Sequence, residues 1–451
     1  MSLLEGRSIN KPLPYEMYER HEFNLWRMQM ESFIFMKDFD SGLTVRRSTQ
    51  KSEANQKDHR TVLAVMLSAM TTVLNNVLVA ASVHNVLYYG AKGDGHTDDT
   101  QAFLKGWNAV CADAGAPTLL VPSGKTFLLS QITFSGPCKA KIHVQIDGTL
   151  MRPNVVWESN EQSWILFNGL DGLVIDGYGE INGQGLSYWD CKIRNICSTA
   201  PNALEVANCD GSTVRGLLIR NSPGMQVVLG FSSKAQINGL TVIAPGESPN
   251  TDGVHISHSQ HVAVSNCVIS TGDDCVSIGN GTFDVNVSRI TCGPGHGISI
   301  GSLGGQHSVS VVEQIRVSYS RIFHATNGLR IKTWQGGSGH VKGITFEHIN
   351  LTAVYNPIII DQYYCPNQVC SNKTSAVAVR DVKYYGIRGT SNQRFGINLR
   401  CSQSRACTGI KMQNVIIQPA SPGQQVEAYC FNSHGTDIQP VFPAVPCLVS
   451  Q

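Results

Sequence analysis

The sequence predicts an all-β fold, a parallel β-helix in which short strands wind into stacked coils. From residue 118 onward, short runs rich in Val, Ile and Leu alternate with Gly, Asn and Pro, and helical periodicity is almost absent. This pattern leaves a sandwich, a propeller or a β-helix. Equivalent apolar positions recur every 21 to 31 residues, whereas propeller blades need about 40 to 50, so the period selects the β-helix. The positions that we align are Leu204, Met225, Val254, Val276, Ile298, Leu329 and Ile358.

The N-terminal region does not share this pattern. Residues 1–57 mix charged and aromatic residues without a sustained period, and we expect them to be disordered or removed. Residues 58–82 resemble a signal peptide, with a positive start, an apolar run and small residues near Ala80. A signal anchor and a buried helix are the alternatives, although Asn75 and Asn76 interrupt the apolar run. A signal that begins near residue 60 is unusual, and the origin of the extension stays open.

We expect residues 83–451 to form a single β-helix domain with a cap at each end. Thr97 is the expected N-cap of a short helix, with Asp98 and Asp99 in its first turn. Such a helix would cover the open apolar end of the first coil. After Val382 the period weakens, so we expect an irregular C-terminal cap. The apolar face of the expected helix carries Ala102, Phe103, Trp107, Val110 and Cys111.

Composition limits the compartment and the partners. The net charge of +2 is too small for nucleic-acid binding by a global field, and we expect a monomer that does not bind a membrane once mature. Fourteen cysteines, several of them close together, indicate an oxidising compartment, although their connectivity stays open. The close cysteines are 191 and 197, 275 and 292, 365 and 370, and 401 and 407, and sequons for N-glycosylation begin at Asn280, Asn286, Asn350 and Asn372.

A column of polar residues stands two positions before the aligned apolar residues. It contains Asp252, Asp274 and His296, with Asp273 beside it, and neighbouring coils are about 4.8 Å apart. Carboxylates this close cannot all ionise at the same pH, so one should keep its proton and act as an acid while another acts as a base. Hydrolysis of a glycosidic bond needs such a pair, although a sequence cannot distinguish the carboxylate spacings of the retaining and inverting mechanisms.

Two cations project from the same expected face. Arg330 and Lys332 alternate with Leu329 and Ile331, in the outer columns of the coils that carry the aspartates. Cations beside a catalytic acid cluster suggest a substrate that carries carboxylates, such as a uronic acid polymer. Each of these residues alone could be a turn residue or part of a solvated strand face. Their coincidence in the same columns of successive coils favours a site.

Four motifs resemble, in order and spacing, the signature motifs of the polygalacturonases, and their flanking residues look like the plant members. They are N-T-D at 250–252, G-D-D at 272–274, G-H-G at 295–297 and R-I-K at 330–332. The resemblance covers roughly residue 85 to the C-terminus. It implies a right-handed parallel β-helix that hydrolyses α-1,4-galacturonosyl bonds in de-esterified pectin (polygalacturonate), with inversion and without a metal or other cofactor. The signal-like segment, the cysteines and the sequons predict a protein secreted to the cell wall, and we expect endo-action, with exo-action as the alternative.

The resemblance further implies a role for each matching residue. Asp273 would be the general acid, and Asp252 and Asp274 would hold and activate the attacking water. His296 would maintain the protonation state of the acid. The residues expected to support the cluster or bind substrate are Asn250, Arg330, Lys332 and Tyr364, with Tyr363 as the less favoured register for the tyrosine.

Two other functions fit a β-helix of this kind. A pectate lyase would need calcium and an arginine base, and a non-catalytic protein would bind pectin without cleaving it. The N-terminal extension departs from the family pattern, and it puts secretion rather than catalysis in question.

Overall fold

The computed structural model describes residues 82–157, 162–197, 199–366 and 371–450. Residues 1–57 and nearly all of the signal-like segment lie outside this part of the chain, and so does Cys370. The predictions made for them therefore stay predictions. No helix among the described residues is long and apolar enough to cross a membrane.

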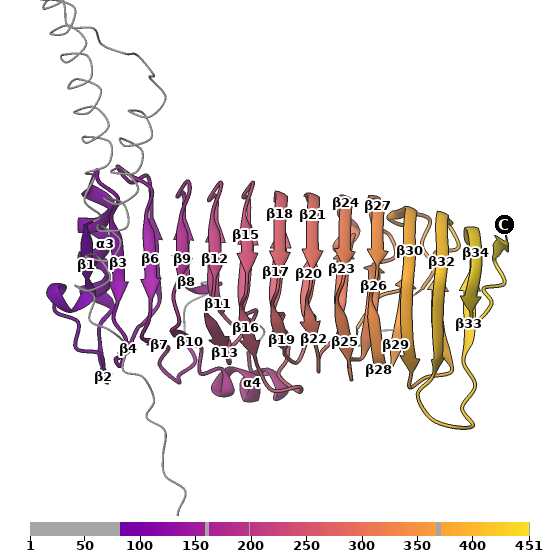
Figure 1. Ribbon diagram of the computed structural model, residues 1–451, viewed down its shortest axis with the longest axis horizontal. Helices are drawn as coiled ribbons and strands as arrows, with labels where there is room; N and C mark the ends of the chain where they lie inside the picture. The colour runs from indigo at the N-terminus through magenta and orange to yellow at the C-terminus, as the bar shows by residue number, and fades with distance from the viewer. Residues whose placement is uncertain (1–81, 158–161, 198, 367–370, 451) are drawn as a thin grey trace, which may run out of the picture. The chain divides into compact units, whose positions relative to one another are not determined.

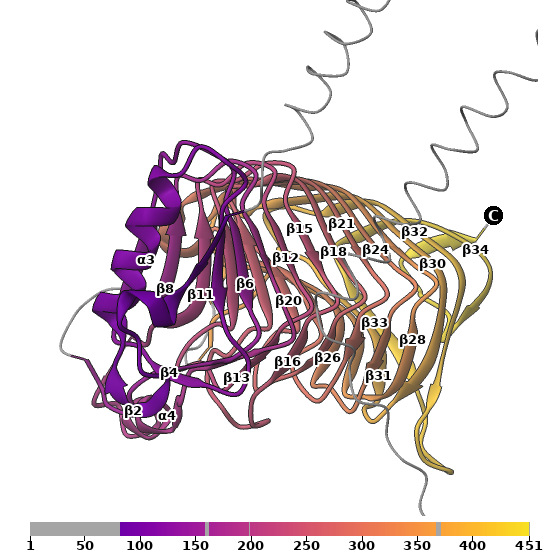
Figure 2. The ribbon, with the colours of Figure 1, turned by 60° about the vertical axis from the view of Figure 1, so that its left-hand side comes forward.

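The described chain winds into a right-handed parallel β-helix, as predicted (Figure 1). Strands of successive coils pair in parallel, and Figure 2 shows the coils stacked one behind another. The described strands form two sheets, which we call sheet A and sheet B. Sheet B contains β5 (Ile132–Ser135), β8 (Ser163–Asn168), β11 (Asn202–Ala207), β14 (Val227–Gly230), β17 (Val254–Ser257), β20 (Val276–Ile278), β23 (Ile298–Leu303), β26 (Asn327–Thr333), β29 (Asn356–Asp361), β31 (Phe395–Arg400) and β33 (Glu427–Phe431).

Sheet A supplies the remaining walls of each coil. It contains β1 (Val83–Asn85), β2 (Asp94–Asp98), β3 (Thr118–Val121), β4 (Thr126–Leu128), β6 (His143–Ile146), β7 (Thr149–Met151), β9 (Val174–Asp176), β10 (Glu180–Asn182), β12 (Thr213–Arg215), β13 (Leu218–Arg220), β15 (Gln236–Asn238), β16 (Thr241–Ile243), β18 (Gln260–Ser265), β19 (Val268–Ser270), β21 (Thr282–Ser288), β22 (Thr291–Cys292), β24 (Val309–Ser318), β25 (Arg321–Phe323), β27 (Ser338–Glu347), β28 (Asn350–Val354), β30 (Ala378–Ser391), β32 (Cys407–Pro419), β34 (Ser433–Phe442) and β35 (Leu448–Ser450).

The apolar column predicted inside sheet B is present, with one correction. Val254, Val276 and Ile298 are aligned across β17, β20 and β23 and are fully buried. Met225 does not belong to this column, because Val227 takes the place opposite Val254. Side chains alternate with a period of two along a strand, so a slip of two residues leaves the inward pattern unchanged and is invisible in the sequence.

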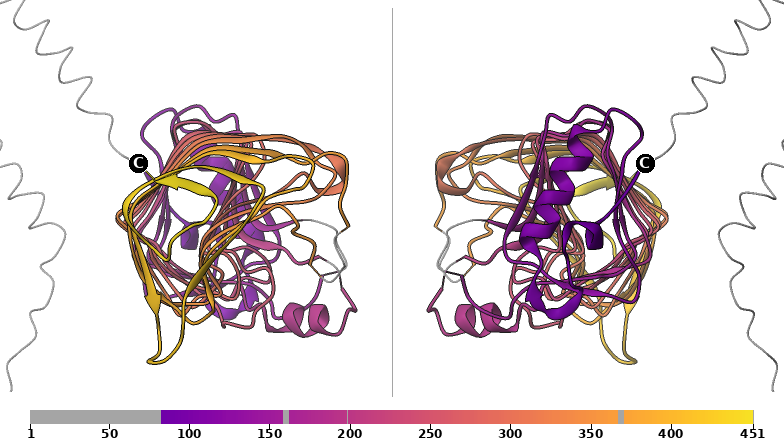
Figure 3. Two further views of the ribbon diagram at one scale, coloured as in Figure 1. Left: turned by 90° about the vertical axis from the view of Figure 1, so that its right-hand side faces the viewer. Right: turned by 90° about the vertical axis from the view of Figure 1, so that its left-hand side faces the viewer.

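The expected N-terminal helix is α3 (Thr100–Ala112), and the N-cap prediction for it is wrong. Thr97 and Asp98 belong to β2, and Asp99 occupies the cap position. The Asp99 carboxylate instead accepts hydrogen bonds from the backbone N–H groups of Lys92 and Gly93, which holds the preceding turn. Figure 3 shows α3 lying across one end of the coils. Its side chains that join the core are Ala102, Phe103, Trp107 and Val110.

The coils continue after Val382, with register shifts between β31 and β33 and between β32 and β34, so the prediction that an irregular cap replaces them there is wrong. β30, β32 and β34 continue sheet A in parallel register, and β31 and β33 continue sheet B. Long strands with polar outward residues hide the period in the sequence. Disulfides join Cys401 to Cys407 and Cys430 to Cys447 in this region.

Three short helices and the other disulfides complete the described chain. The 3-10 helices are η1 (Val86–Tyr89) and η2 (Gly305–His307), and α4 (Leu186–Ile193) interrupts the strand pattern between β10 and β11. Figure 3 shows α4 projecting from the side of the coils. The further disulfides join Cys111 to Cys138, Cys191 to Cys197 and Cys275 to Cys292, while Cys209 and Cys267 are buried free thiols.

Candidate active site

The first polar motif enters sheet B at the start of β17. Asn250 adopts a left-handed backbone conformation (φ 57°), which asparagine tolerates better than most residues. The buried hydroxyl of Thr251 accepts a hydrogen bond from the N–H of Gly272 at 3.1 Å and so ties this turn to the next coil. The left-handed turn at Asn250 and this hydrogen bond place Asp252 at the head of β17, with 7% of its surface exposed.

The second motif delivers two carboxylates from one turn. A Cβ on Gly272 would lie 2.1 Å from the carbonyl oxygen of Ser248, so only glycine lets the two coils approach this closely. Asp273 and Asp274 follow, and the N–H of Asp274 donates to Asp273 Oδ1 at 2.8 Å. Asp273 stays partly exposed, whereas Asp274 is completely buried.

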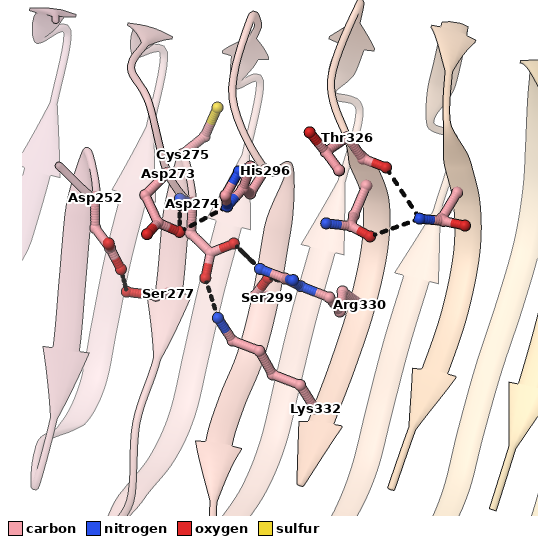
Figure 4. Close-up of polar contacts among 12 residues, drawn as sticks. Asp252, Asp273, Asp274, Cys275, Ser277, His296, Ser299, Thr326, Arg330 and Lys332 are labelled. Atoms are coloured by element: carbon pink, nitrogen blue, oxygen red, sulfur yellow. Dashed lines mark hydrogen bonds and ion pairs between the residues drawn. The ribbon is translucent and has the colours of Figure 1, made fainter. Parts of the chain in front are cut away.

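Asp274 is held by cations from two coils further along (Figure 4). Arg330 Nη2 lies 2.5 Å from Asp274 Oδ1, and Lys332 Nζ lies 2.8 Å from Oδ2. The hydroxyl of Ser299 donates to Oδ1 at 2.7 Å and accepts from Arg330 Nε at 2.8 Å. The column alignment predicted from the sequence is therefore present, since Ser277, Ser299 and Arg330 are paired across β20, β23 and β26.

His296 contacts the partly exposed carboxylate. Its Nδ1 lies 2.9 Å from Asp273 Oδ1, and its backbone N–H donates to the carbonyl oxygen of Asp273 at 2.8 Å. Ligand atoms of Asp273, Asp274 and His296 lie within 4.8 Å of one another. Both oxygens of Asp274 already bind cationic side chains, so a metal ion at this point would meet two positive charges. The expectation that no metal is needed stays a prediction.

The carboxylates differ strongly in proton affinity. Burial, followed by the charges of Asp273 and Asp274, raises the pKa of Asp252 to about 8, against smaller effects of Ser277 and Lys332. Burial also pushes the pKa of Asp273 upward, but the hydrogen bond and charge of His296, with the charge of Lys332, outweigh it and lower the pKa. The proton affinity of Asp252 is therefore higher than that of Asp273.

Asp252 has one polar side-chain partner, Ser277 on the neighbouring strand β20, which in turn contacts His255. The hydroxyl of Ser277 donates to Asp252 Oδ2 at 2.6 Å and lies 2.8 Å from Nδ1 of His255. Burial lowers the pKa of His255 to about 4, so this imidazole is neutral at the pH of most compartments. The chain His255–Ser277–Asp252 fixes the orientation of the carboxyl group without adding a charge to it.

The remaining predicted residues lie at the border of this cluster. Asn250 Nδ2 is 3.5 Å from Asp273 Oδ2, and its Oδ1 accepts a hydrogen bond from Lys192 Nζ at 3.1 Å. Lys332 Nζ lies 5.2 Å from the ring centre of Tyr364, which also meets Trp334 edge to face. The ring of Tyr363 lies instead under the guanidinium of Arg400. Of the two tyrosines, Tyr364 is thus the one beside the cation pair.

The structure brings all eight predicted residues into one region and adds others that sequence reasoning missed. The two serines and His255 occupy outward positions of the same columns, so their register could have indicated them. Lys192 comes from α4, and no period links it to Asn250. The added residues are Lys192, His255, Ser277, Ser299 and Trp334.

Carboxylates with opposite pKa shifts beside a pair of cations, on the outer face of a parallel β-helix, are an arrangement that suits a glycoside hydrolase. Comparison with known proteins agrees and is more specific. Residues 111–437 match the model of the glycosyl hydrolases family 28, and the chain belongs to that family, as one of its polygalacturonases.

Its relatives and structural neighbours carry related names. A probable polygalacturonase of Arabidopsis thaliana is 43% identical over 368 residues, which cover 80% of this chain and 83% of that protein. Polygalacturonase-2 of Solanum lycopersicum is 42% identical over 367 residues, covering 80% of each chain. The endo-xylogalacturonan hydrolase of Aspergillus tubingensis superposes with a TM-score of 0.69 at 24% identity, covering 78% of this chain and 96% of that one. A polygalacturonase of Erwinia carotovora ssp. carotovora gives 0.62 at 21%, with coverages of 78% and 96%. The sequence identities to these two solved structures are below 25%, so the structural comparison supports the fold alone.

Proposed function

We propose that this protein hydrolyses α-1,4-galacturonosyl linkages in de-esterified pectin, acting within the polymer and inverting the anomeric carbon. The observation that carries the proposal is the cation pair Arg330–Lys332 bound to Asp274, within the same cluster as Asp252 and Asp273. Each cation keeps donors that Asp274 does not use, so the pair can bind a substrate carboxylate without releasing the aspartate. The names of the relatives support the same substrate.

In this proposal Asp273 protonates the leaving oxygen, while Asp252 and Asp274 hold and activate the attacking water. The acid needs a proton, although in the free site Asp252 has the higher proton affinity. Lys332 is one of the charges that keep the pKa of Asp273 low. A galacturonate carboxylate bound to Lys332 would offset that charge and raise the proton affinity of Asp273. Binding of an anionic substrate therefore favours the protonation state that the reaction needs.

His296 and Asn250 act on the acid from two sides. His296 Nδ1 contacts one oxygen of Asp273, and Asn250 Nδ2 is directed to the other. Together they orient the carboxyl group. The ring of Tyr364 lies beside Lys332 and would pack against the sugar that this cation binds. We also propose that the protein is secreted to the cell wall and glycosylated, on the basis of the signal-like segment, the described disulfides and the sequons.

The decisive experiment is incubation with polygalacturonate and measurement of new reducing ends, with and without a chelator. We expect reducing ends in both conditions, and no product in an Asp273→Asn variant that keeps the wild-type Tm. Activity that persists in this variant would disprove the role of Asp273. An ultraviolet-absorbing product that disappears with chelator would indicate a lyase, and binding without new reducing ends would indicate a non-catalytic protein. Rapid loss of viscosity would support endo-action, whereas early monomer release would support exo-action.

A further inference from the structure

Lys192 is a cation of the site for which the reaction described above has no use. It lies near the end of α4, next to Cys191, whose disulfide to Cys197 closes the turn after the helix. Its side chain is half-buried, and its ammonium donates to Asn250 Oδ1 at 3.1 Å. Within the described residues no carboxylate lies within ion-pair distance of Nζ, so the positive charge has no direct counter-ion.

Lys192 nonetheless interacts electrostatically with the acid cluster. Burial lowers the pKa of Lys192, while the negative charges of Asp273 and Asp252 raise it. The ammonium carries three N–H donors and uses one on Asn250. It therefore retains two donors and makes no ion pair with a described carboxylate, although it lies close to the carboxylates that would carry the reaction.

The position of Lys192 is opposite to that of the other two cations. It reaches Asn250, on the coil of β17, from the helix that precedes β11. Arg330 and Lys332 reach Asp274 from β26, which is two strands beyond the coil of Asp274 and three strands beyond β17 in sheet B (Figure 4). The acid cluster thus lies between cations on both sides along the axis of the coils. A polymer that carries one carboxylate per sugar would present a negative charge to each side.

We infer that Lys192 binds the carboxylate of a sugar on the β11 side of the scissile bond, opposite the sugar held by Arg330 and Lys332. The inference rests on the proposed function, and it makes Lys192 a determinant of specificity. Cleavage then prefers bonds at which the sugars on both sides are unesterified, because a methyl ester removes the charge that Lys192 recognises. Asn250 would hold the ammonium in place while the two remaining donors reach the substrate.

The test compares Lys192→Met with Arg194→Met, which removes an equal charge from an exposed residue two positions later. We expect Lys192→Met to raise the KM for polygalacturonate by roughly ten- to a hundredfold, as for the loss of a charge-assisted hydrogen bond, with little change in kcat. Arg194→Met should leave both constants unchanged. With polygalacturonates of rising methyl-ester content, the KM of the wild type should rise more steeply than that of Lys192→Met.

Other outcomes overturn the inference. An unchanged KM in Lys192→Met would do so, as would a fall in kcat alone, which would mean that Lys192 only positions Asn250. If Lys192→Met does not fold, Lys192→Arg keeps the charge and must retain the wild-type ester preference; loss of that preference would count against the role. If the wild type releases no reducing ends, the proposed function fails, but equilibrium dialysis with galacturonate oligomers still compares the wild type with Lys192→Met. Equal affinities there would refute carboxylate binding.

Discussion

Asp252→Asn should make the folded protein more stable at neutral pH while removing its activity. The pKa of Asp252 is about 8 in the folded protein, against 3.8 for the ordinary carboxyl group. Between these values the folded state binds more protons than the unfolded state, so stability declines as the pH rises through this window. Below 3.8 both states are protonated and the group has no effect, and above about 8 the loss is complete.

The size of the effect follows from the width of the window. Each unit of pKa difference corresponds to about 1.4 kcal/mol of unfolding free energy. At pH 7 this one carboxyl group therefore lowers the unfolding free energy of the wild type by roughly 4 kcal/mol relative to its value below pH 3.8. Asparagine has nearly the same shape, can still accept the hydrogen bond of Ser277, and carries no charge at any pH. For a domain of this size about 1–2 °C corresponds to 1 kcal/mol, so the Tm should rise by about 4–8 °C at pH 7 and be unchanged near pH 4.

Asp274→Asn is the matched control, with the same chemical change on the next coil and the opposite expected sign. Arg330 and Lys332 would keep their charges beside a neutral amide, and breaking such a buried pair costs about 3–5 kcal/mol. The Tm of this variant should therefore fall at pH 7. The assay is thermal unfolding by circular dichroism at pH 4, 5.5, 7 and 8. Shifts of the same sign in both variants at pH 7, or a gain in Asp252→Asn that persists at pH 4, would refute this electrostatic description.

Two further predictions concern residues around the cluster. Tyr364→Ala should raise the KM for polygalacturonate by about three- to thirtyfold, since the ring contacts Lys332 and Trp334, whereas Tyr363→Ala should leave the KM near the wild-type value. A larger rise in Tyr363→Ala than in Tyr364→Ala would reverse the register of the tyrosine. The double change Cys275→Ala and Cys292→Ala removes a buried disulfide directly after Asp274. It should lower the free energy of unfolding, measured by denaturant titration, by about 2–4 kcal/mol. An unchanged midpoint would show that the packing of the coils alone holds this turn.

Most of the fold and the acid cluster could be predicted because a β-helix converts a sequence period into a column of neighbours. Asp274 and Arg330 are far apart in sequence but meet at 2.5 Å, and the aligned positions Val276 and Leu329 were enough to bring them to the same face. The errors fall where the period carries no information. Met225 was misplaced by one full alternation of side chains, and Thr97 has cap chemistry but lies in a strand.

The electrostatics and the contribution of α4 were beyond this reasoning for physical reasons. A sequence predicts that neighbouring carboxylates must share a proton, but the depth of Asp252 and the pairing of Asp273 with His296 decide which one holds it. Lys192 comes from a helix that leaves the coil and returns, so no spacing rule relates it to Asn250. The columns of outward side chains in sheet B would supply the reacting groups, and any related β-helix with the same coils can present them. Excursions such as α4 are free to vary in length and sequence without disturbing the stack, so differences in substrate preference between related β-helices should arise at such excursions rather than in the columns.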